Sequence, residues 1–185
     1  MKKIFTFIIV LSLGTSVLAQ NNPITGEENI HIINYDFNHH LDLYFTLFTM
    51  QPNNCSPGFQ SLGPTIPLPP AQEAKYSTYI DSDTASGNPY PIDSWYNGNY
   101  LLPNQIPQNI ADDQRWTYMK FELKEIGSVP GQFIPGMSGS IGFNQACTGI
   151  PDVLTGSGTS NTTGISYNFV AKAYTFGGDL WIIVE

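Results

Sequence analysis

Residues 41–50 read LDLYFTLFTM, and their alternation is the clearest structural signal in the chain. In an extended chain, successive side chains point to opposite faces. One face of this stretch therefore carries Leu41, Leu43, Phe45 and Leu47, and the other carries Asp42, Tyr44 and Thr46. A period of two with one apolar face predicts a β-strand that is buried on one side.

The same alternation recurs in two other stretches. Within residues 115–126, Met119, Phe121 and Leu123 share one face and are predicted core residues, with Trp116 on the opposite, more polar face. Residues 165–174 form the third predicted strand, whose residues 165–171 supply another buried face.

Shorter apolar runs are predicted as strands at residues 30–34, 65–68, 74–80, 138–143 and 180–184. The 14 prolines and 17 glycines leave little room for long helices. Residues 81–113 are the least regular region, and the small-residue tract 155–164 is predicted to be a flexible hairpin connection. Several short strands with irregular loops favour an all-β fold, an antiparallel two-sheet sandwich of jelly-roll-like or Ig-like type.

The first nineteen residues have the order of a secretory signal peptide. Lys2 and Lys3 precede an apolar run, and Val17-Leu18-Ala19 supplies a small-x-small cleavage pattern. The run is too short for a membrane span, and no Cys follows it that would anchor a bacterial lipoprotein. We therefore expect a signal peptide at 1–19, a flexible leader at 20–29 and one domain at 30–185, exported by a bacterium to the periplasm or the medium.

The charge of the chain excludes several classes of partner. Removing Lys2 and Lys3 with the signal leaves five basic residues against fifteen acidic ones, a formal net charge of −10. Nucleic acids and anionic lipid surfaces would repel such a protein, because binding to them depends on clustered Lys and Arg. The expected partner is an extracellular glycan or protein.

Cys55 and Cys147 are the only cysteines of the chain. In an oxidising compartment an isolated pair of this kind forms a disulfide. No CxxC spacing indicates a metal or redox role. We therefore predict a bond that ties the loop after residue 50 to the C-terminal half.

Large aromatic residues gather in the irregular region among polar ones. Exposed Trp and Tyr rings stack on the apolar face of a sugar, and nearby amides and carboxylates bind its hydroxyls. The alternative is that these rings cap an open end of the sandwich, because large aromatics dominate core burial. The predicted ligand-binding residues are Tyr90, Trp95, Tyr96, Tyr100, Asp93 and Asn97.

Two metal hypotheses follow from the sequence. Asp81 and Asp83 place hard oxygens at alternate positions, which suits Ca²⁺, although an ordinary Asx-turn explains the same residues. His31 and Asp42, with either His39 or His40, would suit a transition metal if the strands adjoin, although surface histidines are the simpler interpretation. No other cofactor is expected.

A catalytic hypothesis rests on Ser138 in Gly-Met-Ser-Gly-Ser, with His39 and Asp93 completing a triad. The pattern of a nucleophile elbow requires Gly at position 140, where this chain has Ser, and no βαβ unit surrounds it. A turn of small residues is the simpler interpretation of this segment.

The sequence resembles no family closely. Its leading interpretation is a secreted, non-enzymatic β-sandwich that binds an extracellular ligand, expected to be carbohydrate, through residues 90–100. A structural or adhesive module that binds proteins through sheet edges is the alternative, and a small secreted hydrolase is the third hypothesis.

Overall fold

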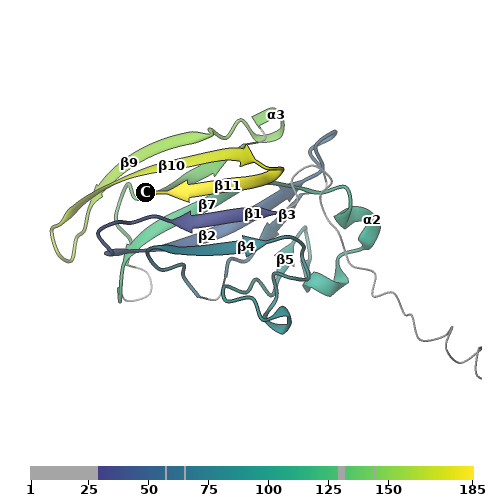
Figure 1. Ribbon diagram of the computed structural model, residues 1–185, viewed down its shortest axis with the longest axis horizontal. Helices are drawn as coiled ribbons and strands as arrows, with labels where there is room; N and C mark the ends of the chain where they lie inside the picture. Colours follow the sequence, from purple (N-terminus) through teal and green to yellow (C-terminus); the bar gives the residue numbers. More distant parts are fainter. Residues whose placement is uncertain (1–28, 57, 65, 129–131, 144) are drawn as a thin grey trace, which may run out of the picture.

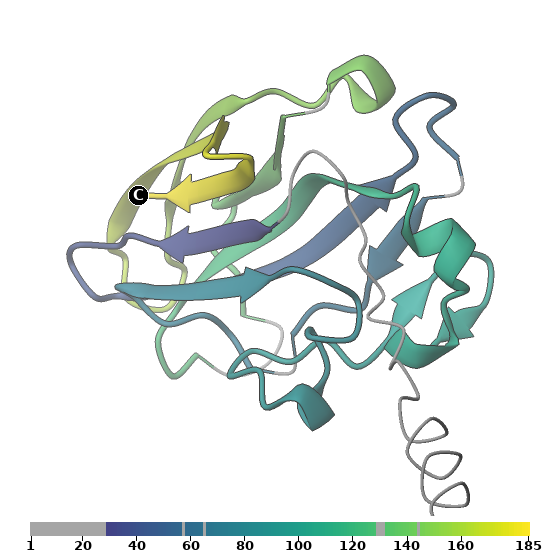
Figure 2. The same cartoon turned by 45° about the vertical axis from the view of Figure 1, so that its right-hand side comes forward.

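The chain folds into two sheets that pack face to face, which confirms the predicted β-sandwich (Figures 1 and 2). The computed structural model describes residues 29–56, 58–64, 66–128, 132–143 and 145–185. The expected signal peptide 1–19 and leader residues 20–28 lie outside these ranges.

One sheet has five strands in the order β4-β1-β11-β10-β9. All its pairs are antiparallel except β1 and β11, which run parallel. This exception lets the first described strand lie beside the last one, as Figure 1 shows. The strands are β1 (Ile30–Asn34), β4 (Gln72–Tyr76), β9 (Val153–Thr159), β10 (Ser166–Phe176) and β11 (Asp179–Val184).

The other sheet has six strands in the order β6-β5-β3-β2-β7-β8, all antiparallel. At its centre the two longest predicted strands pair so that Leu43 faces Leu123 and Phe45 faces Phe121. The strands are β2 (Leu41–Met50), β3 (Phe59–Ser61), β5 (Trp95–Tyr96), β6 (Tyr100–Leu101), β7 (Arg115–Glu125) and β8 (Ser138–Gly142).

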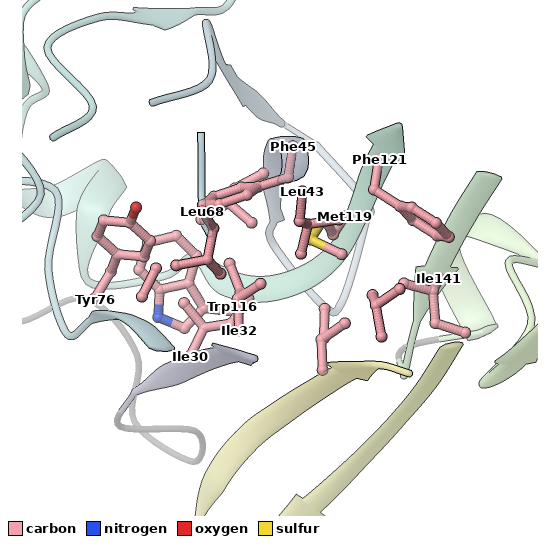
Figure 3. Packing of buried hydrophobic residues seen from close by; sticks show 14 of the residues in the cluster. Ile30, Ile32, Leu43, Phe45, Leu68, Tyr76, Trp116, Met119, Phe121 and Ile141 are labelled. Carbon is pink, nitrogen blue, oxygen red and sulfur yellow. The ribbon is translucent and has the colours of Figure 1, made fainter. Parts of the chain in front are cut away.

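The core fills the space between the sheets, and the alternation identified its central residues correctly. Met119, Phe121 and Leu123 are buried, together with the apolar face of β2. Figure 3 shows Ile30 and Ile32 of the five-stranded sheet in the same cluster as Leu43 and other side chains of the six-stranded sheet. Phe169 and Ala171 of β10 are also buried, but Ile165 is 48% exposed because it precedes that strand.

A β-bulge in β7 overturns the predicted orientation of Trp116. Phe48 pairs with Tyr118 and Thr49 with Trp116, so Thr117 is an additional residue in β7. The extra residue inverts the alternation for the start of the strand. Trp116 therefore enters the core, where it is 1% exposed.

Short strands and turns were predicted less accurately. Of the described residues 66–68 in the predicted strand 65–68, only Leu68 makes a β-bridge, with Leu43. The predicted strand at 74–80 is displaced, since β4 ends at Tyr76. The irregular region 81–113 contains β5, β6, the 3₁₀ turns Thr84–Ser86 and Pro103–Gln105, and the short helix α2 (Gln108–Ala111).

The predicted flexible tract 155–164 is for the most part a strand. Residues 155–159 belong to β9, which pairs with β10 along its whole length. Gly156 and Gly158 face inwards, where a Cβ would lie 2.3 Å from the Phe169 ring and 2.2 Å from the Pro135 carbonyl oxygen. These glycines serve close packing, and only the turn at 160–165 is a connection.

Cys55 and Cys147 form the predicted disulfide, with their Cα atoms 5.4 Å apart. The bond joins the loop after β2 to the short helix α3 (Gln145–Thr148), which lies between β8 and β9. Among the described residues, no helix has both the length and the apolar character needed to cross a bilayer.

Candidate ligand-binding face

The hairpin of β5 and β6 separates the predicted aromatic residues into a buried set and an exposed set. Trp95 is 0% exposed and Tyr90 is 9% exposed, whereas Tyr96 is 41% and Tyr100 is 69% exposed. Trp95 and Tyr96 are consecutive in a strand, so their side chains take opposite faces of the sheet. Only Tyr96 and Tyr100 present their rings to solvent.

Trp95 is a core residue. Its ring centroid lies 4.7 Å from that of Tyr79 in an edge-to-face arrangement and 6.0 Å from that of Trp116. Tyr76 closes the same cluster and donates a hydrogen bond of 2.7 Å to the Tyr90 carbonyl oxygen. Burial raises the pKa of the Tyr79 hydroxyl beyond its ordinary range, which is typical of a phenol in an apolar interior.

Tyr96 and Tyr100 begin a row of side chains that crosses the outer face of the six-stranded sheet. The strand register pairs Tyr100 with Tyr96, Tyr96 with Gln60, Gln60 with Phe48, and Phe48 with Tyr118. We call these five residues the aromatic row. At about 4.8 Å between strands, the row spans roughly 19 Å.

The two ends of the aromatic row differ in exposure. The rings of Tyr96 and Tyr100 are 5.1 Å apart, tilted and accessible, and Gln60 beside them is exposed. The rings of Phe48 and Tyr118 stack on each other at 4.2 Å and are largely buried. The exposed half is available to a ligand, and the buried half supports it.

A hollow of about 350 Å³ lies on the same face of the sheet. Tyr44 and Thr46 of β2 and Lys120 and Glu122 of β7 line it, and residues 62–64 form one wall. Lys120 places its Nζ 5.1 Å from the centroid of the Phe48 ring, so the hollow adjoins the aromatic row. It offers ammonium and hydroxyl donors next to carboxylate acceptors.

Asp93 precedes β5 and Asn97 follows it in the chain, and the two side chains differ in availability. Both oxygens of the Asp93 carboxylate accept hydrogen bonds from Thr84, from its backbone nitrogen at 2.8 Å and its hydroxyl at 2.9 Å. Asn97 is exposed in the β5–β6 turn, adjacent to Tyr96. Asn97 thus remains a candidate ligand contact, whereas Asp93 shapes the loop.

Asp81 and Asp83 both bind backbone. Asp81 accepts hydrogen bonds of 2.8 Å from the nitrogens of Ser77 and Thr78, and Asp83 caps the 3₁₀ turn by accepting from the nitrogen of Ser86 at 2.9 Å. These are Asx-type interactions. In the described ranges, no three His, Cys, Asp or Glu residues are grouped as metal ligands.

His31 lies between two carboxylates on the outer face of the five-stranded sheet. Its Nδ1 is 2.5 Å from Glu73 Oε1 and its Nε2 is 2.9 Å from Asp179 Oδ2, while its ring stacks on Trp181 at 3.8 Å. Both ring nitrogens are therefore engaged by β4 and β11. His39 and His40 line a different hollow, described below.

Ser138 lies at the start of β8, where it pairs with Glu122. No hydrogen bond between described residues joins it to His39 or Asp93. The structure therefore does not bring the three residues of the hypothetical triad into a hydrogen-bonded chain.

Sequence reasoning placed Tyr44 and Thr46 on the outward face of β2 but did not assign that face, Gln60 or Lys120 to the candidate site. Tyr44, Thr46 and Phe48 alternate with the core residues of that strand, which is the signal that places them together on its outward face. Gln60 belongs to a strand of three residues, which carries no recognisable period.

These features define the molecule as a two-sheet β-sandwich with an aromatic row on the outer face of one sheet. Comparison of the chain with protein-family models, with curated proteins and with solved structures found no match.

Proposed function

We propose that this protein is a secreted, non-enzymatic module that binds carbohydrate on the outer face of its six-stranded sheet. The proposal rests on the exposed Tyr96–Tyr100 pair, which stands in register with exposed Gln60. The export signal at residues 1–19 would place this face in the periplasm or the medium.

The chemistry of the face suits a neutral or weakly charged sugar. A tyrosine ring offers a large apolar surface and loses little conformational entropy on binding, because it has only two side-chain torsions. Gln60 and Asn97 supply amide donors and acceptors beside the two rings. Lys120 and Glu122, further along the face, would select among sugar substituents.

The proposal is tested by titrating the disulfide-intact protein with a panel of soluble polysaccharides and oligosaccharides. We expect Tyr96→Ala and Tyr100→Ala each to weaken binding about tenfold, the loss expected when a stacked ring is removed. Tyr174→Ala is the matched control, because Tyr174 is 40% exposed in a strand of the other sheet. The proposal would be overturned if no saccharide in the panel bound, or if all three variants lost affinity equally.

The second candidate function is adhesion to a protein through a sheet edge. It is favoured by β9, an edge strand of seven residues whose outer side has no partner strand in the described part of the chain. An open edge can accept an extended peptide as an additional strand. Val153→Pro in this edge would weaken the binding of such a protein partner and leave sugar binding unchanged.

A further inference from the structure

A second hollow lies at one end of the sandwich, away from the aromatic row. It consists of two adjoining parts of about 410 and 230 Å³ that share Glu125 and Thr162 among their lining residues. The β1–β2 and β9–β10 connections both reach this end, which is at the left in Figure 1. We call it the end cleft.

Glu125 enters the end cleft because it continues the inward face of β7. Phe121 and Leu123 precede it at alternate positions and are core residues. Tyr167 continues the inward face of β10 in the same way, beyond Phe169. β7 therefore ends and β10 begins at a polar contact between the sheets, where the Tyr167 hydroxyl donates to Glu125 Oε1 at 2.8 Å.

Three hydroxyl groups hold the Glu125 carboxylate. Besides Tyr167, the Thr163 hydroxyl donates to Oε1 at 2.6 Å and the Ser160 hydroxyl donates to Oε2 at 2.9 Å. The Thr163 bond is the main cause that lowers the pKa of Glu125, against the opposing effect of burial. The carboxylate is accordingly ionised at neutral pH.

His40 also lines the end cleft, and its Coulombic interaction is the last and smallest of the causes that lower the pKa of Glu125. No salt bridge between described residues joins Glu125 to a Lys or Arg. A carboxylate has about four acceptor positions, and three of them are used, which leaves one on Oε2 for a ligand. Most residues that line the end cleft are polar, but Phe133 and Ile165 add apolar surface to it, since they are 58% and 48% exposed.

We propose that the end cleft binds an organic cation, a primary ammonium or guanidinium group carried on an apolar stem, with Glu125 as its counter-charge. The cation would donate to the free position on Oε2, and the stem would lie against Phe133 or Ile165. The Phe133 ring would add a cation–π attraction.

Two other ligand classes fit the end cleft less well. A neutral polyol would find most acceptor positions of Glu125 already filled and would leave its charge uncompensated. A hard metal ion requires six or more oxygen ligands, and no group of His, Cys, Asp or Glu in the described segments is arranged to supply them.

The experiment uses hexylamine hydrochloride and hexylguanidinium chloride as probes, with 1-hexanol as the neutral analogue. Each is titrated into the ¹⁵N-labelled, disulfide-intact protein at constant ionic strength. We expect both cations to bind at least tenfold more tightly than hexanol and to shift the amides of residues 160–167. Glu125→Gln should reduce cation binding at least tenfold and leave hexanol binding unchanged.

Asp152→Asn is the matched control, because it makes the same change in charge at an exposed position before β9, at the opposite end of that strand. Ile165→Ser at the exposed rim gives a second test that does not alter the hydrogen-bonding side chains around Glu125. Equal affinity for hexylamine and hexanol, or shifts outside the end cleft, would overturn the proposal. Tyr96→Ala should leave hexylamine binding unchanged, which separates this site from the carbohydrate face.

Discussion

Trp95 and Tyr96 are adjacent in the chain but serve opposite faces of one sheet, and this determines what their substitution does. Trp95 is fully buried among Tyr79 and Trp116, and its indole N–H has no acceptor in the described part of the structure. Trp95→Ala should therefore reduce the free energy of unfolding by about 3–5 kcal/mol. Trp95→Phe should cost much less, since it keeps a ring and removes an unpaired donor.

Urea unfolding followed by circular dichroism measures both changes. Tyr100→Ala is the control, because its exposed ring should alter stability by less than about 0.5 kcal/mol. If Trp95→Ala were as stable as the parent protein, Trp95 would not be the core residue that the structure describes.

Two carboxylates make stability depend on pH. Hydrogen bonds from Thr163, Tyr167 and Ser160 outweigh burial and lower the pKa of Glu125 below its ordinary 4.5. For Asp179, burial raises the pKa, but hydrogen bonds from Asn29 and His31 outweigh it and bring the value below 3.8. A carboxylate with a lowered pKa in the folded state stabilises the fold above its unfolded pKa, and this contribution is lost as the pH falls through the folded pKa.

We therefore expect the free energy of unfolding to fall between about pH 5 and pH 3. The double variant Glu125→Gln/Asp179→Asn should start less stable at pH 7 and lose less over the same range. The measurement is urea unfolding at a series of pH values. A double variant that retains the full slope of the parent protein would show that other carboxylates govern acid unfolding.

At the scale of the element, regular alternation made the long strands predictable, and the short apolar runs of β1, β8 and β11 were also predicted. The strands that the sequence did not predict are β3, β5, β6 and β9. β2 and β7 each extend over ten or more residues, so their period of two is plain in the sequence. β9 has glycines at two of its three inward positions, which weakens the apolar half of the pattern, because Phe169 of the neighbouring strand fills the space beside Gly156. β5 has two residues, and only its pairing with β3 and β6 decides which side Tyr96 faces. The candidate site was therefore predicted as a set of aromatic residues but not as a surface.

Gly142 in β8 permits close approach to the β7 bulge. A Cβ at this position would lie 2.5 Å from the Thr117 carbonyl oxygen and 2.4 Å from Tyr118 Cβ, atoms that the backbone holds in place. Gly142→Ala should therefore destabilise the protein by about 1–3 kcal/mol. At Gly139 in the same strand the nearest atom is the end of the flexible Leu154 side chain, so Gly139→Ala should cost less. Thermal unfolding of the two variants compares them, and the reverse order would contradict this account.

At the scale of the whole molecule, the two sheets are joined by separate contacts at the two ends of the sandwich. The disulfide between Cys55 and Cys147 lies where the chain passes from β8 of one sheet to β9 of the other. Glu125 joins β7 to β10 and to the turn after β9. The seven residues of β9 separate these contacts by roughly 20 Å.

Contacts this far apart, with no shared partners, should contribute independently to stability. Cys55→Ser/Cys147→Ser should lower the free energy of unfolding by about 2–5 kcal/mol, because it frees a loop of 92 residues in the unfolded chain. Adding Glu125→Gln should then lower it by the same amount as in the disulfide-intact protein, within about 0.5 kcal/mol. Urea unfolding of the parent protein, the two variants and their combination gives the four free energies of a double-mutant cycle. A coupling free energy larger than this would mean that the two ends of the sandwich act as one unit. In that case, releasing the connection from β8 to β9 at α3 would also loosen the hydroxyl groups that hold Glu125.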